Sequence, residues 1–195
     1  DECTDILTSI LAQNPNYNNI ALLNLKGDVL ASGKPFFKTN LADRKHFKTV
    51  MATKMFATGE YIVTRVGTKN PSFPFAFPVL DTQGELKAVL TAVIKVNVFS
   101  QLFDVSSLPE KSFIAVSDSQ GVRLFYYPAQ DNTNPIGKPI GVNSWDIAQK
   151  GGDQGYFTGR GSDGLNRIFA YKKVGLENEN TPYLYVWAGI PEDYI

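Results

Sequence analysis

Three segments of this chain share one plan, in which an apolar run is followed by a turn containing glycine and then by a second apolar run. The turns contain Lys26-Gly27-Asp28, Asp81-Thr82-Gln83-Gly84 and Asp118-Ser119-Gln120-Gly121. Aspartate at the start of a turn and glycine at its left-handed position are what tight β-hairpins require. The pattern therefore predicts a fold dominated by antiparallel meanders.

The first and third hairpins open two half-length copies of the same order of elements. The first copy is expected to contain the hairpin Ile20–Ser32, a short helix at Leu41–Thr53, and strands near Glu60–Val66, Phe73–Leu80 and Glu85–Val96. The second is expected to contain the hairpin Phe113–Tyr127, the Pro/Asn/Gly-rich stretch Pro128–Val142, a short helix near Trp145–Gln149, and strands near Gly155–Thr158, Asn166–Lys172 and Tyr183–Ile190. A repeat of this length predicts two linked domains rather than a solenoid, which needs three or more shorter units.

A helix is expected before the first copy, because Asp1–Gln13 carries apolar side chains at a helical period and Asn14-Pro15-Asn16 ends it. A second short helix is expected at Val98–Phe103, where it joins the two copies. The predicted division is an N-terminal helix in residues 1–19, one domain in residues 20–104 and another in residues 105–195.

The strand Lys87–Val96 is apolar on both faces, so we expect it in the middle of a sheet that is covered on each side. The N-terminal helix is expected to cover one face, and the helix that carries Arg44 and His46 is expected to cover the other. A small pocket between that second helix and the sheet follows from this arrangement.

Composition excludes several classes of function. Lys+Arg and Asp+Glu are both 19, and no basic stripe is present, so nucleic acid is not an expected partner. Cys3 is the single cysteine and His46 the single histidine, so neither a disulfide framework nor a zinc site is expected, and no cofactor is implied. The apolar run Ala88–Val96 carries Lys95 and is shorter than the roughly 20 residues of a membrane helix.

No catalytic motif stands out, and the pattern favours a receptor over an enzyme. The stretch Arg160-Gly161-Ser162-Asp163-Gly164 lacks the first glycine of G-x-S-x-G and the Lys-Ser/Thr pair of a P-loop. We expect it to be a hairpin turn. The chain begins without Met inside an expected helix, so we interpret it as an excerpt of a longer protein.

The order of motifs resembles the double Cache domain, also called the double PAS-like sensor domain. The matching residues are NLADRKHF, PFAFPVLDTQGELKAVLTAVIKV, SDSQGV and the closing YVWAGIP. The resemblance implies an α+β fold of two tandem PAS-like domains, each a central antiparallel sheet with flanking helices, preceded by a long N-terminal helix. It also implies an extracytoplasmic sensor at the cell membrane, held between two transmembrane helices of a receptor, usually a histidine kinase and sometimes a chemoreceptor or a cyclic-dinucleotide enzyme.

The resemblance further implies that a small metabolite binds the membrane-distal copy, here about residues 20–96. Relatives that bind dicarboxylates and pyruvate use an R-x-Y-F motif, which Arg44-Lys45-His46-Phe47 matches with His46 in place of tyrosine. They also place a lysine on the last distal strand, as Lys95 is placed here. An organic acid is therefore the expected ligand, and the sensor domain itself is not expected to be an enzyme.

The residues themselves leave alternatives open for this site. Arg44 either forms an exposed ion pair with Asp43, or it opens a helix capped by Asp43 and binds a carboxylate bidentately. His46 either packs in the core or donates to a ligand and makes binding pH-sensitive. Lys95 either reaches solvent or meets an anion in the pocket.

The remaining candidate residues are expected around the same pocket. Thr64 and Arg65 are neighbours on an expected strand, so only one of them is expected to face the ligand. Phe47 is expected mainly in the core, and aromatic walls are expected from Tyr61, Phe75 and Phe77.

The leading hypothesis is a sensor that binds a small carboxylate through Arg44, His46 and Lys95 and forms a homodimer through its N-terminal helix. A rival of another class is a soluble hydrolase that uses His46 with Ser162 or with a carboxylate. A third hypothesis is a structural module without a ligand, which only mediates dimerisation.

Overall fold

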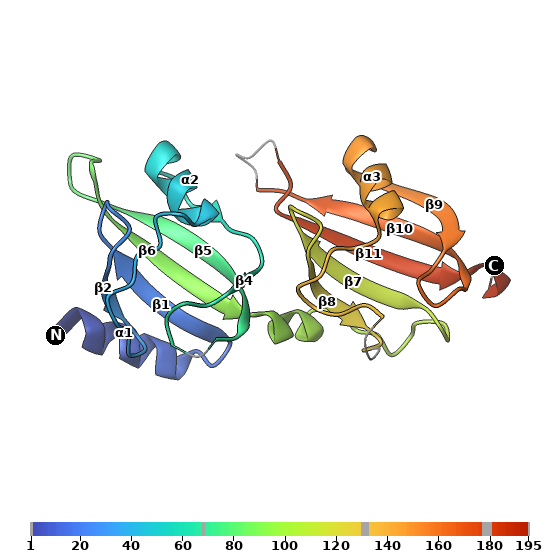
Figure 1. Cartoon of the computed structure of the whole chain (residues 1–195), viewed down its shortest axis with the longest axis horizontal. Coiled ribbons are helices and arrows are strands. Elements are labelled where there is room, and N and C mark those ends of the chain that lie inside the picture. Colours follow the sequence, from blue (N-terminus) through green and yellow to red (C-terminus); the bar gives the residue numbers. More distant parts are fainter. Residues whose placement is uncertain (1, 68, 130–132, 177–180, 195) are drawn as a thin grey trace. The chain divides into compact units, whose positions relative to one another are not determined.

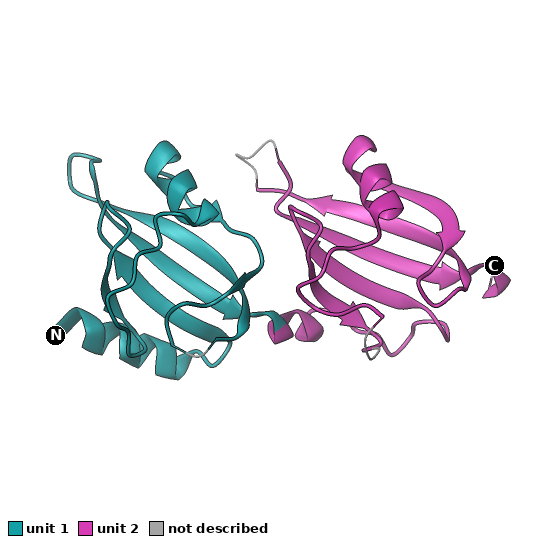
Figure 2. Ribbon diagram, in the orientation of Figure 1, with its two compact units in different colours: residues 1–96 teal, residues 97–195 magenta. Residues whose placement is uncertain are grey.

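The computed structural model describes residues 2–67, 69–129, 133–176 and 181–194, and it divides into two compact units, residues 1–96 and 97–195 (Figure 2). The first unit contains α1 (Glu2–Gln13), β1 (Tyr17–Leu23), β2 (Val29–Ser32), α2 (Lys45–Thr53), β3 (Ala57–Thr58), β4 (Ile62–Val63), β5 (Pro71–Leu80) and β6 (Leu86–Lys95). The second contains the 3₁₀ helix η1 (Val96–Gln101), which begins at the last residue of the first unit, and β7 (Phe113–Asp118), β8 (Arg123–Tyr127), α3 (Val142–Lys150), β9 (Gln154–Arg160), β10 (Asn166–Val174), β11 (Leu184–Pro191) and η2 (Glu192–Tyr194).

Each unit is built on one antiparallel sheet, and the two sheets have the same strand order (Figure 1). The first sheet runs β2-β1-β6-β5-β3, with β4 also paired to β5, and the second runs β8-β7-β11-β10-β9. Each strand of the first sheet except β4 therefore has a counterpart at the same place in the second. The predicted α+β class with a repeated antiparallel sheet is confirmed.

The two equivalent hairpins, β1–β2 and β7–β8, close in the same way. Each turn opens with a side-chain oxygen, from Asn24 or Asp118, that accepts two backbone N–H groups at 2.9 Å. Each then needs a left-handed residue, which glycine adopts without steric cost, at Gly27 (φ +83°) and Gly121 (φ +75°). The hairpins predicted at these places are present, and the first turn begins at Asn24.

The first sheet is covered on both faces, as the apolar strand Lys87–Val96 predicted. On one face Ile20 and Leu90 pack with Leu7 of α1, and on the other Val89 packs with Val50 of α2. Neighbouring residues of one strand point to opposite faces of the sheet. The strands β1 and β6 therefore contact α1 on one face and α2 on the other (Figure 1). This places β6 in the centre of its sheet.

Some predicted boundaries are wrong. The helix α2 begins at Lys45 rather than Leu41, because the residues before it form a turn. The predicted strand Glu60–Val66 is paired only at Ile62–Val63, since the chain bends soon afterwards, and β3 was not predicted. The expected helix at Val98–Phe103 is the 3₁₀ helix η1, and α3 and β9 are both longer than predicted.

Candidate ligand-binding site

A small cavity lies between the first sheet and the segment that leads into α2. Its floor comes from β1 and β6, and its walls come from the start of α2 and from the chain after β4. The residues that line it are Asn19, Ala21, Leu41, Arg44, His46, Ile62, Thr64, Arg65, Val66, Thr91 and Val93. The cavity measures about 30 Å³, about a fifth of the roughly 150 Å³ of a cavity that holds benzene. An organic acid can enter only if a wall moves.

Arg44 is the N-cap residue of α2, with extended backbone (φ −74°, ψ 137°). Its Nη2 donates to the Val63 carbonyl oxygen at a long 3.4 Å, and its Nε is buried without a hydrogen-bond partner. Burial lowers the pKa of Arg44, and repulsion from Arg65 lowers it further. Among the described residues no carboxylate forms an ion pair with Arg44, so a partly dehydrated positive charge faces the cavity.

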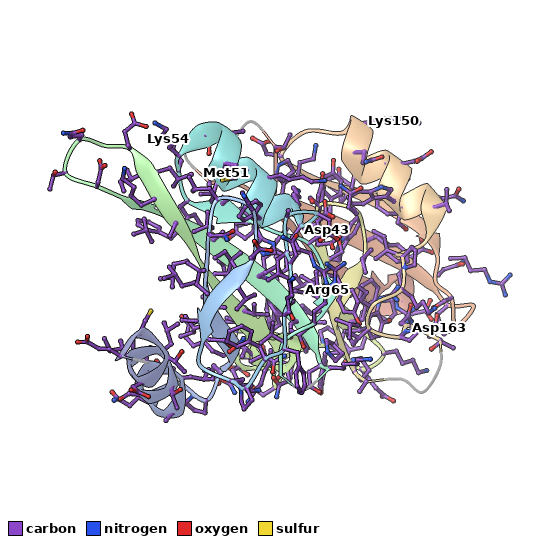
Figure 3. All side chains as sticks on the ribbon, turned by 60° about the vertical axis from the view of Figure 1, so that its left-hand side comes forward. Asp43, Met51, Lys54, Arg65, Lys150 and Asp163 are labelled. Atoms are coloured by element: carbon purple, nitrogen blue, oxygen red, sulfur yellow. The ribbon has the colours of Figure 1, made fainter. Side chains whose placement is uncertain are left out.

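Asp43 does not cap α2, contrary to the prediction. The helix start has no side-chain cap, and the carboxylate of Asp43 instead accepts Arg65 Nη1 at 2.7 Å and Nη2 at 2.8 Å (Figure 3). This bidentate hydrogen bonding holds the pKa of Asp43 below its usual range. The pair ties the chain after β4 to the turn before α2, and the nearest carboxylate is thereby occupied by Arg65 instead of Arg44.

His46 is buried, with 3% of its surface exposed, and it lines the cavity from the first turn of α2. Burial and then the charge of Arg44 lower the pKa of His46 to about 4, and Asp43 opposes this only in part. The imidazole is therefore neutral at pH 7. A neutral ring carries one N–H donor and one acceptor, which suits a carboxylate or a carbonyl beside Arg44.

Four of the predicted site residues, Arg44, His46, Thr64 and Arg65, line this cavity together. The expectation that only one of Thr64 and Arg65 can do so is wrong, because the chain leaves strand geometry after Val63 and no longer alternates its faces. Thr64 also accepts Asn18 Nδ2 at 3.3 Å, in a buried polar network beneath the loop.

The other five predicted residues do not line the cavity. Phe47 is buried in the core under α2, which was the main expectation for it. Phe75 stacks on Phe56 with ring centroids 5.8 Å apart, and 56% of Phe77 is exposed. Tyr61 is half-buried outside the lining.

Lys95 turns away from the cavity, which corrects its predicted place beside Arg44. It lies at the end of β6, and its ammonium group donates to the Pro15 carbonyl oxygen at 2.6 Å. This side chain ties the end of the strand to the turn that follows α1. A lysine in an apolar strand is satisfied here by backbone rather than by an anion.

Sequence reasoning missed two polar residues of the cavity floor. Asn19 is 3% exposed and its amide exchanges hydrogen bonds with Ser32, while Thr91 Oγ1 donates to the Ala21 carbonyl oxygen at 3.2 Å. The signal that identifies such residues is an asparagine or threonine inside an apolar strand, on the face opposite to α1.

The residues of the hydrolase hypothesis do not lie within one unit. His46 belongs to the first unit and Ser162 to the second, and Asp43 is engaged with Arg65. Ser162 lies in the turn between β9 and β10, as predicted, and its hydroxyl accepts Asn134 Nδ2 at 3.0 Å. No group of three or more metal-ligating side chains occurs in the described parts of the chain, and none of the described helices is long and apolar enough to cross a bilayer.

A family model described as the Cache domain matches residues 1–195. Sporulation kinase D of Bacillus subtilis is 31% identical over 121 residues, which cover 62% of this chain and 23% of the kinase. The chain is therefore similar to less than a quarter of that relative's length.

Solved structures share the fold at low sequence identity. The periplasmic sensory domain of the Campylobacter jejuni chemoreceptor Tlp1 matches with a TM-score of 0.68 at 13% identity, over 99% of this chain and 79% of that one. The sensor domain of the V. cholerae histidine kinase DctB matches with a TM-score of 0.62 at 14% identity, over 97% of this chain and 77% of that one.

Proposed function

The chain belongs to the Cache domain family, and on that premise we propose that it is the extracytoplasmic sensor of a membrane receptor and binds a small organic acid in its first unit. The similarity to a sporulation kinase and the likeness to the sensor domain of a histidine kinase support a histidine kinase as the parent protein, and the likeness to a chemoreceptor domain makes that class the alternative. The ligand-binding part of this proposal rests on the cavity beside α2.

One observation carries the choice of an acid. Arg44 lines the cavity with a buried Nε that has no partner, while the adjacent carboxylate of Asp43 is held by Arg65. An anion stabilises a desolvated guanidinium more than it stabilises a hydrated guanidinium, and the planar guanidinium group fits a carboxylate. The neutral ring of His46 supplies a hydrogen bond to the same ligand.

Binding requires the cavity to open, because about 30 Å³ cannot hold an organic acid. The wall that closes it is the chain after β4, which is held down by the pair between Asp43 and Arg65. In the proposal the incoming carboxylate occupies Arg44 and this wall moves outward. A ligand shifts a conformational equilibrium only by the difference between its affinities for the two states. Here the two states are the closed and the open cavity.

The sheet offers a path from the cavity to α1. Asn19 and Ala21 of β1 lie in the cavity floor, and Ile20 between them packs with Leu7 of α1 on the opposite face. A shift of β1 therefore changes the position at which α1 packs on the sheet. Ile6 of α1 is 53% exposed and Ile10 is 42% exposed, which supports the proposal that this helix pairs with a second copy in a homodimer.

A thermal-shift screen tests the proposed function. Acetate, lactate, pyruvate, malonate and succinate are compared at fixed pH and ionic strength. At least one is expected to raise the melting temperature in a saturable manner. Arg44→Gln is expected to abolish that rise, and Lys48→Gln, which removes an exposed charge of α2 outside the cavity, is expected to keep it. A full shift in the Arg44 variant would contradict the proposal.

A further inference from the structure

The second unit contains a larger cavity, of about 140 Å³, at the place that corresponds to the first cavity. The registers of the two sheets show the correspondence. Ala21 of β1 lies opposite Thr91 of β6 in the first cavity floor, and Ala115 of β7 lies opposite Trp187 of β11 in the second. In both units the start of the following helix forms a wall, through Arg44, the N-cap residue of α2, and through Ser144 in α3.

Arg123 brings a positive charge into this second cavity from a strand rather than from a helix. In the first unit the backbone N–H of Val29 donates to the Thr39 carbonyl oxygen at 3.0 Å. In the second unit the backbone N–H of Arg123 donates to the Lys138 carbonyl oxygen at 2.9 Å. Arg123 therefore occupies the position of Val29, which is a core residue of the first unit.

The guanidinium of Arg123 is buried, and no described residue matches it with an opposite charge. The residue is 6% exposed, and its Nε is buried without a hydrogen-bond partner. Within the described parts of the chain, its other nitrogens donate to neutral oxygens, the Pro135 carbonyl at 3.1 Å and Asn134 Oδ1 at 3.2 Å. Among the described residues no carboxylate lies within ion-pair distance of it. A buried cation in this state is costly unless an anion compensates it.

A second arginine in the cavity lining is already neutralised. Arg167, which is 3% exposed, donates Nη1 and Nη2 to the two carboxylate oxygens of Asp163, each at 2.6 Å. It also donates Nε and Nη2 to the Lys111 carbonyl oxygen at 3.1 and 2.8 Å. The carboxylate of Asp163 is thereby occupied, and Arg167 acts as scaffold rather than as a free cation.

The remaining walls combine aromatic side chains with polar ones, namely Asn134, Ser144, Ser162 and the exposed Arg160, whose Nε donates to the Gly164 carbonyl oxygen at 2.8 Å. Phe113 and Tyr126 are stacked with ring centroids 5.3 Å apart, and Trp187 and Phe169 complete the floor. At the rim α3 begins at Gly141 without a side-chain cap, so the first N–H groups of the helix add to the positive potential. A cavity near this size accommodates an apolar ligand of about six non-hydrogen atoms, since an engineered cavity of about 150 Å³ binds benzene.

We propose that this cavity is a second ligand site, distinct from the one beside Arg44, and that it takes a small monocarboxylate with a compact apolar body. The carboxylate pairs with Arg123, and the apolar body lies against Phe113 and Trp187.

Tryptophan fluorescence tests this site without interference from the first unit. Both tryptophans of the chain, Trp145 and Trp187, belong to the second unit, and Trp187 lines the cavity. Isobutyrate and isovalerate are transparent where tryptophan is excited, and isobutyramide is a neutral isostere. We expect a saturable fluorescence change with either acid and none with the amide.

Two variants separate this site from the proposed site of the first unit. Arg123→Gln is expected to weaken isobutyrate binding by about tenfold or more, the loss typical of a charge-assisted hydrogen bond. Arg44→Gln is expected to leave it unchanged, so failure of one proposal does not entail failure of the other. Circular dichroism checks that the Arg123 variant is folded. If it is not, Ser144→Leu, which fills the cavity from α3, is expected to block binding instead.

The outcomes that overturn the proposal are equally specific. It fails if neither acid produces a saturable change or a heat of binding in the wild-type chain. It also fails if isobutyramide binds as tightly as isobutyrate, or if the folded Arg123 variant, or the Ser144 variant in its place, binds as tightly as the wild type.

Discussion

Arg65, which lines the first cavity, and Asp43 face each other in a two-pronged pair, with Nη1–Oδ1 at 2.7 Å and Nη2–Oδ2 at 2.8 Å (Figure 3). The pair has two effects that matter together. It holds the chain after β4, which lines the cavity, against the turn before α2, and it occupies the carboxylate of the residue next to Arg44. Both effects favour an exogenous anion that has to open the wall in order to bind.

Asp43→Asn is expected to tighten binding of the acid found in the screen. The substitution weakens the ion pair with Arg65 and leaves Arg44 and Arg65 in place. An exposed ion pair of this kind contributes up to about 1 kcal/mol, so the affinity for the acid is expected to rise about two- to fivefold. Isothermal titration calorimetry measures it. Glu85→Gln is the matched control, because it breaks the exposed Lys54–Glu85 pair (3.0 Å) outside the cavity and should leave affinity unchanged. Weaker binding in the Asp43 variant would argue against the proposal that the Asp43–Arg65 pair opposes ligand entry.

His46 makes the stability of the first unit depend on pH. Its pKa falls from 6.5 in the unfolded chain to about 4 in the folded one, so between these values the unfolded state binds the extra proton. The contribution is fully present above pH 6.5 and is lost as the pH falls toward 4, and it amounts to about 3 kcal/mol. Denaturant unfolding at pH 7 and pH 4.5 measures it. The loss should be much smaller in folded His46→Gln; an equal loss would refute this cause.

Lys95→Gln is expected to change affinity for the first-site acid by less than about twofold, because its ammonium binds the Pro15 carbonyl oxygen outside the cavity. The loss of this charge-assisted hydrogen bond should lower the free energy of unfolding by about 1 kcal/mol. Calorimetric titration and denaturant unfolding of the same variant test both parts. A loss of binding as large as that of Arg44→Gln would restore Lys95 to the site.

The pair between Arg167 and Asp163 is expected to hold the second unit together. The side chain of Arg167 is 3% exposed, so Asp163→Asn leaves a buried cation unpaired and should cost about 2 to 3 kcal/mol of unfolding free energy. Asp146→Asn breaks the exposed pair with Lys150, at 3.5 Å, and should cost less than about 0.5 kcal/mol. If chemical denaturation shows equal losses of unfolding free energy in the two variants, burial of the Arg167–Asp163 pair does not contribute to stability.

The sequence predicted the fold where local chemistry decides the conformation. Hairpin turns at Gly27 and Gly121 follow from backbone requirements that only a few residues meet, and the two-sided apolar strand placed β6 in the centre of its sheet. Prediction failed where a tertiary partner decides. Asp43 has the residue type of an N-cap, but Arg65 competes for its carboxylate.

The site was predicted only in part for the same reason. Arg44 and His46 follow from the motif and the helix that carries it. Lys95 does not, because side-chain direction at a strand end depends on the nearby Pro15 carbonyl. The charge in the second cavity comes from Arg123 on β8, where the first unit has Val29, so a search for the first motif in the second half cannot find it.

The most direct test of the central claim is a ¹⁵N–¹H NMR titration of the wild-type chain with pyruvate or with whichever acid gives the largest thermal shift. The account predicts saturable shift changes that are largest at Arg44, Thr64 and Thr91, around the first cavity, and that vanish in folded Arg44→Gln. Saturable changes that exclude these amides, or that persist in the Arg44 variant, would contradict it.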